Sequence, residues 1–291
     1  ARAESGSTPR AAESPPHGQP VLQARGLQAG YPGMGKVFSS LDLDLVRGEV
    51  LAVIGPNGSG KTTLFRVLSG ELAPLAGEVL VEGRGSRGSA GGRAWSSVAR
   101  LRPRERARLV ARVLQSEQPA WAVPVADYVE AGLFASEGWF SHDPARASAM
   151  VSWALDSVGI SQLAARPVTE LSGGEFRRVV IARALAQDTD VLLLDEPTAD
   201  LDLAHQMETL ELLHDLARGG KAVAFSVHDL NQAAMAADRV LLLAQGGAAA
   251  FGTPSQVLTP GRIEEAYGAA VVSAKHPRLD LPLIVPDPYW K

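Results

Sequence analysis

The chain contains no cysteine among its 291 residues. This absence excludes disulfide bridges, thiol nucleophiles and zinc sites with cysteine ligands, and it is compatible with a reducing compartment. Hydrophobic residues make up 46% of the sequence, which is ample for one large core or two modest ones. We therefore expect the chain to fold without covalent cross-links.

The sequence also lacks a long uninterrupted hydrophobic run. Its most apolar stretch, residues 232–252, is interrupted by Asp238, Arg239 and Gln245, which are costly in hydrocarbon. We therefore expect that the chain does not span a bilayer. Residues 1–19 are rich in Pro, Ser and Ala without an apolar centre, which predicts a disordered tail and not a secretory signal. Folded structure is expected to start near Val21.

A strong excess of either charge is missing as well. The formal net charge is -4, which gives no general attraction to nucleic acid or anionic lipid. Positive charge is concentrated locally, since nine arginines lie between Arg84 and Arg112. Such a segment could form a nucleic-acid surface, but aromatic residues do not alternate with the arginines. We favour a Gly/Ser loop at 83–100 and then a short exposed helix, with Pro103 in its first turn and the arginines towards solvent.

Short β-rich runs alternate with helical patterns along the rest of the chain. Residues 37–46 alternate apolar and polar side chains, as a half-buried antiparallel strand does. Continuous apolar runs at 50–54, 191–194 and 222–227 are typical of parallel strands covered on both faces, and a helical pattern follows each. The sequence therefore predicts an α/β fold, with a mostly parallel sheet and an N-terminal antiparallel β portion.

The β signal disappears between about Pro119 and Gln187, where apolar residues recur at helical spacing. This pattern predicts a helical subdomain inserted into the sheet domain. After Pro260 we expect a short helix and then extended segments limited by prolines. The predicted division is a disordered tail at 1–19, an α/β core at 20–116 and 188–259, a helical subdomain at 117–187 and a C-terminal extension at 260–291.

The stretch GPNGSGKT matches the phosphate-loop pattern G-x-x-x-x-G-K-[ST] between an apolar strand and a helix. Its backbone N–H groups and the helix N-terminus favour phosphate. Lys61 is expected to reach the β- and γ-phosphates, and the Thr62 hydroxyl to bind Mg²⁺. The residues expected to contact the nucleotide are Gly55, Pro56, Asn57, Gly58, Ser59, Gly60, Lys61, Thr62 and Thr63. The sequence thus predicts a P-loop NTPase core that binds a nucleoside triphosphate and Mg²⁺.

Two carboxylates follow the apolar run VLLL, at Asp195 and Glu196. A buried strand presents such residues at its carboxyl end, where α/β sheets bind ligands. Asp195 would complete the Mg²⁺ shell through water, and Glu196 would polarise the attacking water as a general base.

A second glycine-rich stretch, LSGGE, opens the helical pattern at 174–187. The hydroxyl of Ser172 and the N–H groups of Gly173 and Gly174 would lie at the positive end of that helix, a position suited to phosphate. Ser172 and Glu175 also fit the S-x-x-E capping box, so a purely structural cap is the alternative. The chain thus has two phosphate cradles and only one predicted nucleotide site.

The motifs GPNGSGKTT, LQ ending at Gln115, LSGGE, LLLDEP, ADLD and VHDL resemble, in this order, those of the ATP-binding subunits of ABC transporters. The resemblance covers about residues 21–259, and LSGGQ or LSGGE is that family's defining signature. It implies that two copies pack head to tail, with each ATP between one copy's phosphate loop and the other's signature. Hydrolysis then removes the γ-phosphate that joins the subunits, so ATP favours the closed dimer.

The resemblance also implies roles that residue type alone does not support. Tyr31 matches an aromatic residue that stacks on adenine, and His228 one that contacts the γ-phosphate and orients water. Gln115 matches the glutamine that joins Mg²⁺ to the helical subdomain. Asp202 matches the acidic end of a loop that crosses the dimer interface. Asp200 stands where a small apolar residue is expected, so this loop departs from the family's pattern at that position.

Residues 227–240, 200–206 and 263–286 look like those of importers of iron–siderophore, haem or cobalamin. This likeness implies a second copy of the chain, transmembrane permease subunits and, indirectly, a substrate-binding protein as partners. It also implies a peripheral position on the cytoplasmic face of the inner (plasma) membrane, with no nucleic-acid partner.

Two other functional classes are weighed against a transporter subunit. A soluble ABC ATPase acting on nucleic acid or ribosomes would use the arginine segment, but such proteins carry long coiled coils or paired cassettes. Here one cassette has only about 110 residues between Lys61 and Ser172. A nucleotide-binding scaffold without turnover is disfavoured because Lys61, Asp195, Glu196 and His228 are all present.

Overall fold

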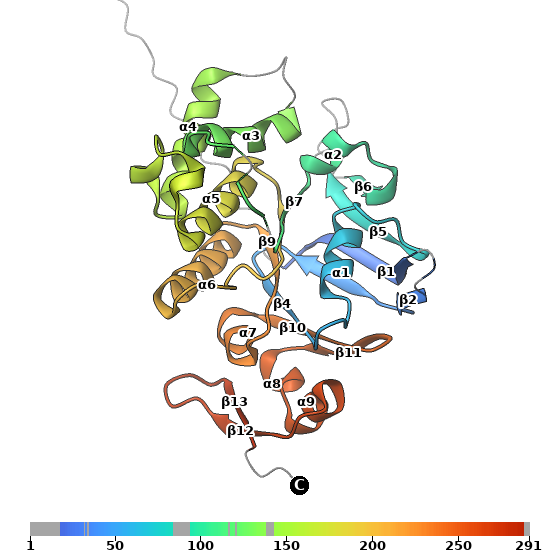
Figure 1. Cartoon of the computed structure of the whole chain (residues 1–291). Helices are drawn as coiled ribbons and strands as arrows, with labels where there is room; N and C mark the ends of the chain where they lie inside the picture. Colours follow the sequence, from blue (N-terminus) through green and yellow to red (C-terminus); the bar gives the residue numbers. More distant parts are fainter. Residues whose placement is uncertain are drawn as a thin grey trace, which may run out of the picture.

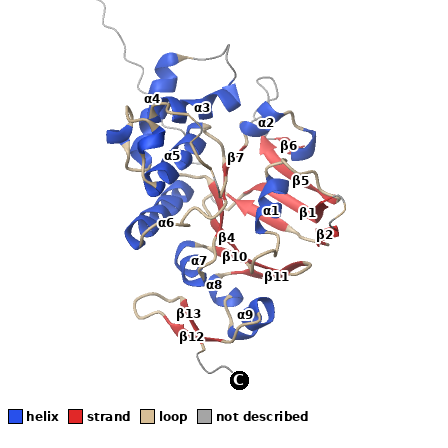
Figure 2. Ribbon diagram, in the orientation of Figure 1, coloured by secondary structure: helices blue, strands red, loops and turns tan. Residues whose placement is uncertain are grey.

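The computed structural model describes residues 18–287, apart from 32, 34, 84–93, 116, 120 and 138–142. It has the predicted α/β architecture, in which two sheets are covered by helices (Figures 1 and 2). Residues 1–17 of the predicted tail lie outside the described residues. Residues 84–93 of the predicted loop at 83–100 lie outside them as well. Strand β1 begins at Pro20, close to the expected start of the fold at Val21.

A six-stranded sheet forms the centre of the molecule. Its order is β11-β10-β4-β9-β8-β7, and only the pair β10–β11 is antiparallel. The strands are β4 (Val50–Ile54), β7 (Val110–Val113), β8 (Val191–Leu194), β9 (Ala222–Ser226), β10 (Arg239–Ala244) and β11 (Gly247–Gly252). Strands β4, β8 and β9 are the three predicted apolar runs, and every residue in them is buried. This confirms parallel strands covered on both faces.

Alternate side chains of β4 belong to two different cores. Val50, Ala52 and Ile54 join a cluster with helices α5 (Gly173–Ala186), α6 (Leu203–Arg218) and α7 (Leu230–Ala236). Leu51 and Val53 join a second cluster with α1 (Lys61–Leu68) and the antiparallel sheet. Successive strand residues point to opposite faces, so α1 and α5 lie on opposite sides of this sheet.

The predicted antiparallel β portion is a second sheet of order β2-β1-β5-β6, with β3 also paired to β1. Its strands are β1 (Pro20–Tyr31), β2 (Gly35–Phe38), β3 (Leu43–Val46), β5 (Ala76–Gly83) and β6 (Ala94–Ser97). The expectation of one strand over 37–46 was wrong. The end of the long strand β1 pairs with β2, and its beginning pairs with β3. Residues 39–42 connect β2 to β3 and form no strand.

Three helices pack together and fall between β7 and β8 in the sequence: α3 (Val125–Glu137), α4 (Pro144–Ser157) and α5. Short 3₁₀ turns at Ser161–Leu163 and Val168–Glu170 lead from α4 to α5. The described residues between 117 and 187 contain no strand, in agreement with the predicted helical segment.

The arginine-rich segment has the predicted short helix, α2 (Pro103–Ala107), with Pro103 in its first turn and Arg104 exposed. A 3₁₀ turn at Val98–Arg100 precedes it. The solvent-facing position expected for all the arginines was wrong for Arg112, which lies on β7. Its buried side chain contacts the carboxylates of Glu71 and Asp195, because β7 is a strand of the central sheet and lies beside β8.

The C-terminal part consists of α8 (Pro254–Val257), α9 (Pro260–Tyr267) and a hairpin of β12 (Val271–Lys275) and β13 (Pro282–Pro286). The side chain of Asn231 accepts from the N–H of Ile284 at 2.8 Å and donates to its carbonyl at 3.1 Å. Burial raises the pKa of Tyr267 to about 12.

No helix in the described part of the chain is long and apolar enough to cross a membrane.

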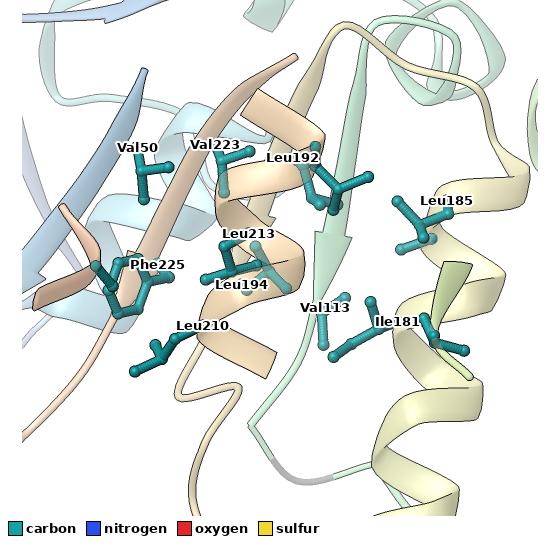
Figure 3. Packing of buried hydrophobic residues seen from close by; sticks show 14 of the residues in the cluster. Val50, Val113, Ile181, Leu185, Leu192, Leu194, Leu210, Leu213, Val223 and Phe225 are labelled. Carbon is teal, nitrogen blue, oxygen red and sulfur yellow. The ribbon is translucent and has the colours of Figure 1, made fainter. Parts of the chain in front are cut away.

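Truncation of Phe225 to alanine is expected to lower the free energy of unfolding by about 3–5 kcal/mol, because it leaves a cavity in the core. Phe225 is fully buried on β9, between strands β4 and β8 and near Leu194 and Leu213 (Figure 3). Phe251→Ala is the matched control, since Phe251 is exposed and its ring lies against the guanidinium of Arg239. For that control, urea unfolding should show a loss of at most about 1 kcal/mol in the free energy of unfolding. Equal losses in the two variants would contradict this packing.

Candidate functional site

Four neighbouring parallel strands end at one edge of the central sheet, in the order β4-β9-β8-β7. Each is followed directly by a predicted motif. The phosphate loop follows β4, His228 comes after β9, Asp195 and Glu196 follow β8, and Gln115 comes after β7. Because the carboxyl ends of parallel strands form the ligand-binding edge of α/β sheets, the fold gathers these residues at one place.

The phosphate loop turns directly into helix α1. Gly60, the residue before the helix, has a φ of 103°, and a Cβ atom there would lie 2.5 Å from Cγ1 of Val37, so glycine is required. Among the described residues, the backbone N–H groups of this loop that have no acceptor include those of Gly58, Gly60, Lys61 and Thr62. Such a group of donors at a helix N-terminus can bind a phosphate.

The ammonium group of Lys61 lies inside this loop. Its Nζ donates to the carbonyls of Gly55 at 2.7 Å and Pro56 at 3.2 Å. Burial lowers the pKa of Lys61, whereas the charges of Glu196 and Asp195 act in the opposite direction. Within the described chain Lys61 has no ion-pair partner, so its charge is available to an anion in the loop.

The carboxylate of Asp195 is only 1% exposed and is held from two sides. Its Oδ1 accepts from the Ser226 hydroxyl at 2.7 Å, and its Oδ2 lies 3.4 Å from Nη2 of Arg112. The same Ser226 oxygen accepts from the backbone N–H of Glu196 at 2.9 Å. Ser226 therefore fixes both acidic residues relative to strand β9.

Glu196 is the centre of a three-residue cluster. Its Oε2 accepts from Nε2 of Gln115 at 2.7 Å, and its Oε1 lies 2.7 Å from Nε2 of His228. These partners stand 81 and 32 residues away in the sequence. The structure thus brings together three of the predicted residues, with a potential general base between an amide and an imidazole.

The donor atoms at this edge fit Mg²⁺. The Thr62 hydroxyl, the Asp195 carboxylate and the Gln115 amide oxygen are hard oxygen ligands, which Mg²⁺ prefers. The amide nitrogen of Gln115 is used by Glu196, which leaves its oxygen for a cation. In the part of the chain that the structure describes, no group of three His, Cys, Asp or Glu side chains could hold a metal alone. A cation here would therefore share its shell with nucleotide oxygens and water.

The signature stretch forms the N-terminus of α5. Ser172 and Glu175 make the predicted capping box: Oγ of Ser172 accepts from the Glu175 N–H at 3.3 Å, and the carboxylate accepts from the Ser172 N–H at 2.8 Å. The bonds from Ser172 lower the pKa of Glu175. Within the described chain, the N–H groups of Gly173 and Gly174 have no acceptor. The helices that carry the two cradles, α5 and α1, flank opposite faces of the sheet (Figure 1).

Tyr31 and Asp202 lie outside the cluster. The Tyr31 hydroxyl bonds Oγ1 of Thr63 at 3.2 Å and accepts from Nη1 of Arg66 at 3.1 Å, so the phenol is held beside α1. Asp202 caps helix α6 by accepting from the His205 N–H at 2.9 Å, and this bond lowers the pKa of Asp202.

Sequence reasoning missed three residues that hold the site together: Ser226, Arg112 and Arg177. Arg177 lies on α5, and its guanidinium donates to four backbone carbonyls beside Gln115 and Glu196. Two weak signals were present in the sequence. Ser226 is a polar residue within an apolar run, and helical spacing places Arg177 between Gly173 and Val180 on the side that faces the sheet.

The family model described as "ABC transporter" matches residues 38–199. The hemin import ATP-binding protein HmuV of Thermobifida fusca is 39% identical, over 92% of this chain and 89% of the relative. The HmuV protein of Pseudomonas aeruginosa is 42% identical, over 86% of this chain and 93% of the relative. The cobalamin import ATP-binding protein BtuD of Halobacterium salinarum is 37% identical, over 92% of this chain and 64% of the relative.

Solved structures give the same family. A protein described as a metal-chelate type ABC transporter, in an inward-facing conformation, aligns with a TM-score of 0.77 and 29% identity, over 93% of this chain and 99% of the other. CbiO1 of Clostridium perfringens, part of the ABC transporter complex CbiONQ, aligns with a TM-score of 0.69 and 26% identity, over 84% and 93%. The chain therefore belongs to the ATP-binding proteins of the ABC transporter family, and it is an ATPase.

Proposed function

We propose that this chain is the ATP-hydrolysing subunit of an importer, which drives uptake of a haem-, cobalamin- or iron–siderophore-type substrate through a separate transmembrane permease. The hemin and cobalamin import proteins that align with most of its length support this assignment. The observation that carries the catalytic part is the cluster of Gln115, Glu196 and His228 next to the phosphate loop.

In the proposed reaction, the ATP phosphates bind to the unpaired N–H groups of the phosphate loop and to Lys61. Glu196 accepts a proton from the water that attacks the γ-phosphorus, and His228 orients this water and the γ-phosphate. The bond between the γ-phosphorus and the β–γ bridging oxygen breaks, so that ADP leaves and inorganic phosphate is formed. Thr62, Asp195 and Gln115 would hold Mg²⁺, which neutralises charge on the phosphate oxygens when it is bound. Tyr31 would stack on the adenine.

We also propose that the γ-phosphate is bound by a second copy of the chain. The exposed residue Ser172 and the unpaired N–H groups of Gly173 and Gly174 support this role, because their helix α5 packs on the opposite face of the sheet from α1, the helix that follows the phosphate loop. Asp202 would meet the facing subunit in the same dimer.

The permease is proposed to dock beside Gln115. A cavity of about 440 Å³ lies between this segment and α5, lined among others by Gln118, Pro119, Val168 and Phe176. Trp121, on the same segment, is 78% exposed. An exposed aromatic residue beside a partly apolar cavity is a common anchor for a partner helix.

We also propose a division of the chain into subdomains and a location for it. The chain is divided into a core at 20–116 and 188–259, a helical subdomain at 117–187 and an extension at 260–291. It is placed peripherally at the cytoplasmic face of the inner (plasma) membrane, through its permease, with a substrate-binding protein as an indirect partner.

Purification of the tagged chain from native membranes tests the transporter assignment. We expect a protein with several membrane spans to co-purify in detergent, and to be identified by mass spectrometry. The transport substrate then follows from uptake assays with the reconstituted complex. Recovery of ribosomes or nucleic acid in place of a permease would favour the alternative class of soluble ABC ATPase.

The docking site makes a sharper prediction. Trp121→Ala should lower permease recovery by at least about 10-fold, because an exposed aromatic anchor contributes about 2 kcal/mol or more to an interface. The matched control is Trp153→Ala on helix α4, where the tryptophan is 42% exposed and lies on a segment that contributes no residue to the lining of the cavity. Unchanged recovery with Trp121→Ala would place the permease elsewhere.

A further inference from the structure

Arg177 joins three segments that are far apart in the sequence. Its Nη1 donates to the carbonyls of Leu114 at 2.6 Å and Gln115 at 3.1 Å. Its Nη2 donates to the carbonyls of Asp195 and Glu196, both at 2.6 Å. One side chain on α5 thus holds the backbone at the ends of β7 and β8, at two of the three residues whose side chains form the catalytic cluster.

The guanidinium is buried, since Arg177 is only 9% exposed. Burial lowers the pKa of Arg177, whereas nearby carboxylates, first that of Asp195, raise it. A buried cation is tolerated when most of its donors are satisfied. Here four carbonyls accept from the two terminal nitrogens, whereas Nε has no partner among the described residues. Removal of the guanidinium would leave these carbonyls without their shared donor.

The backbone of Glu196 is in an unusual conformation, with a φ of 50°. A residue other than glycine keeps a positive φ only where the surrounding structure holds its backbone in that conformation. The N–H of Glu196 bonds to Ser226 at 2.9 Å, and its carbonyl accepts from Arg177 at 2.6 Å. Both ends of the residue are therefore fixed, and Arg177 fixes one of them.

Gln115 is held in the same way. Its carbonyl accepts from Arg177, while its side-chain amide donates to Glu196. The separation between Gln115 and Glu196 therefore depends on one guanidinium that contacts the backbone of both. Arg177 also lies five residues after Ser172, on the first turns of the helix that carries the signature.

We propose that Arg177 is a positioning residue for ATP hydrolysis. It aligns the Glu196 carboxylate with Gln115 in its own subunit, and it makes this alignment depend on the position of the same helix that presents Ser172 to the facing subunit. The two half-sites of one chain are thereby joined through a single side chain. This inference rests on the proposed role of Glu196 as the general base.

The kinetic test compares Arg177→Met, which keeps the length of the side chain without its donors, with Arg177→Lys. We expect kcat to fall at least about 30-fold in Arg177→Met, while KM for ATP changes less than about 3-fold, because the phosphate loop is untouched. Arg177→Lys should recover part of kcat. The matched control is Arg178→Met, which removes the neighbouring arginine and its ion pair with Glu208, and it should stay within about 3-fold of the parent.

A double variant separates positioning from a merely structural effect. In a Glu196→Gln background, Arg177→Met should cause less than about a 3-fold further loss in single-turnover rate, because there is no carboxylate left to align. The folded fraction of each variant is checked by circular dichroism. Parental kcat in Arg177→Met, or an equally large loss in both backgrounds, would overturn the proposal.

The same series distinguishes this inference from the proposed function. If Glu196→Gln is inactive and Arg177→Met retains the parental kcat, only the role of Arg177 fails. If Glu196→Gln itself hydrolyses ATP at the parental rate, the general-base assignment fails, and the positioning role fails with it.

Discussion

Replacement of Glu196 by glutamine is expected to lower the rate of ATP hydrolysis by roughly 10²–10⁴-fold, because the general base is lost. ATP binding should persist. The amide keeps the shape of the carboxylate and can still accept from Gln115, while the phosphate loop and Lys61 are unchanged. With ATP intact, the head-to-tail dimer should accumulate. Phosphate release measures the first effect, and size-exclusion chromatography with and without ATP measures the second.

Glu264→Gln is the matched control for this variant. It makes the same chemical change on helix α9, at an exposed position, and it should leave turnover at the parental value. Turnover at the parental rate in Glu196→Gln would remove the general-base assignment. Loss of hydrolysis without an ATP-dependent dimer would keep that assignment and contradict the proposed bridging by ATP.

Two inactive variants are expected to restore activity when they are mixed. Ser172→Arg places a bulky side chain at the exposed N-terminus of α5, where the γ-phosphate of the facing subunit would bind, so homodimers of this variant should be inactive. Glu196→Gln homodimers should be inactive as well. A mixed dimer, however, combines the intact catalytic loops of the first variant with the intact signature of the second. An equimolar mixture should therefore recover roughly a quarter of the parental ATPase activity.

The control for complementation carries both changes in one chain. When the Ser172→Arg/Glu196→Gln chain is mixed with the parental chain, each site of the mixed dimer has one defect, so these dimers should be inactive. The comparison uses the same total protein and the same ATP concentration in each mixture. If each chain instead completed its own site, the first mixture would stay inactive and the second would keep half of the parental rate.

The motifs themselves were predictable because each is a local structure. A glycine loop between an apolar strand and a helix leaves N–H groups unpaired, and this depends only on consecutive residues, here Gly55 to Thr62. The capping box of Ser172 and Glu175 is equally local, and it forms as predicted. The apolar runs of β4, β8 and β9 are buried on both faces, as their composition requires.

Other features depend on which segments become neighbours. Residues 37–46 alternate like one strand, but the length of β1 decides that they form two. Arg112 lies in a segment of exposed arginines, yet its place on β7 turns it towards Glu71 and Asp195. In both cases the local pattern is compatible with several pairings, and hydrogen bonds to distant strands select one.

By itself, the sequence determined the kinds of chemical group that this protein has: a phosphate loop, a pair of acidic residues, a histidine and a capped signature helix. Only the tertiary structure decided that Gln115, Glu196 and His228 meet, and that Arg177 holds two of them by their carbonyls. An apolar run contains the information that a strand is buried, but not which strands lie beside it. Strand order and helix packing are set by contacts between distant segments, and in this chain those contacts assemble the site.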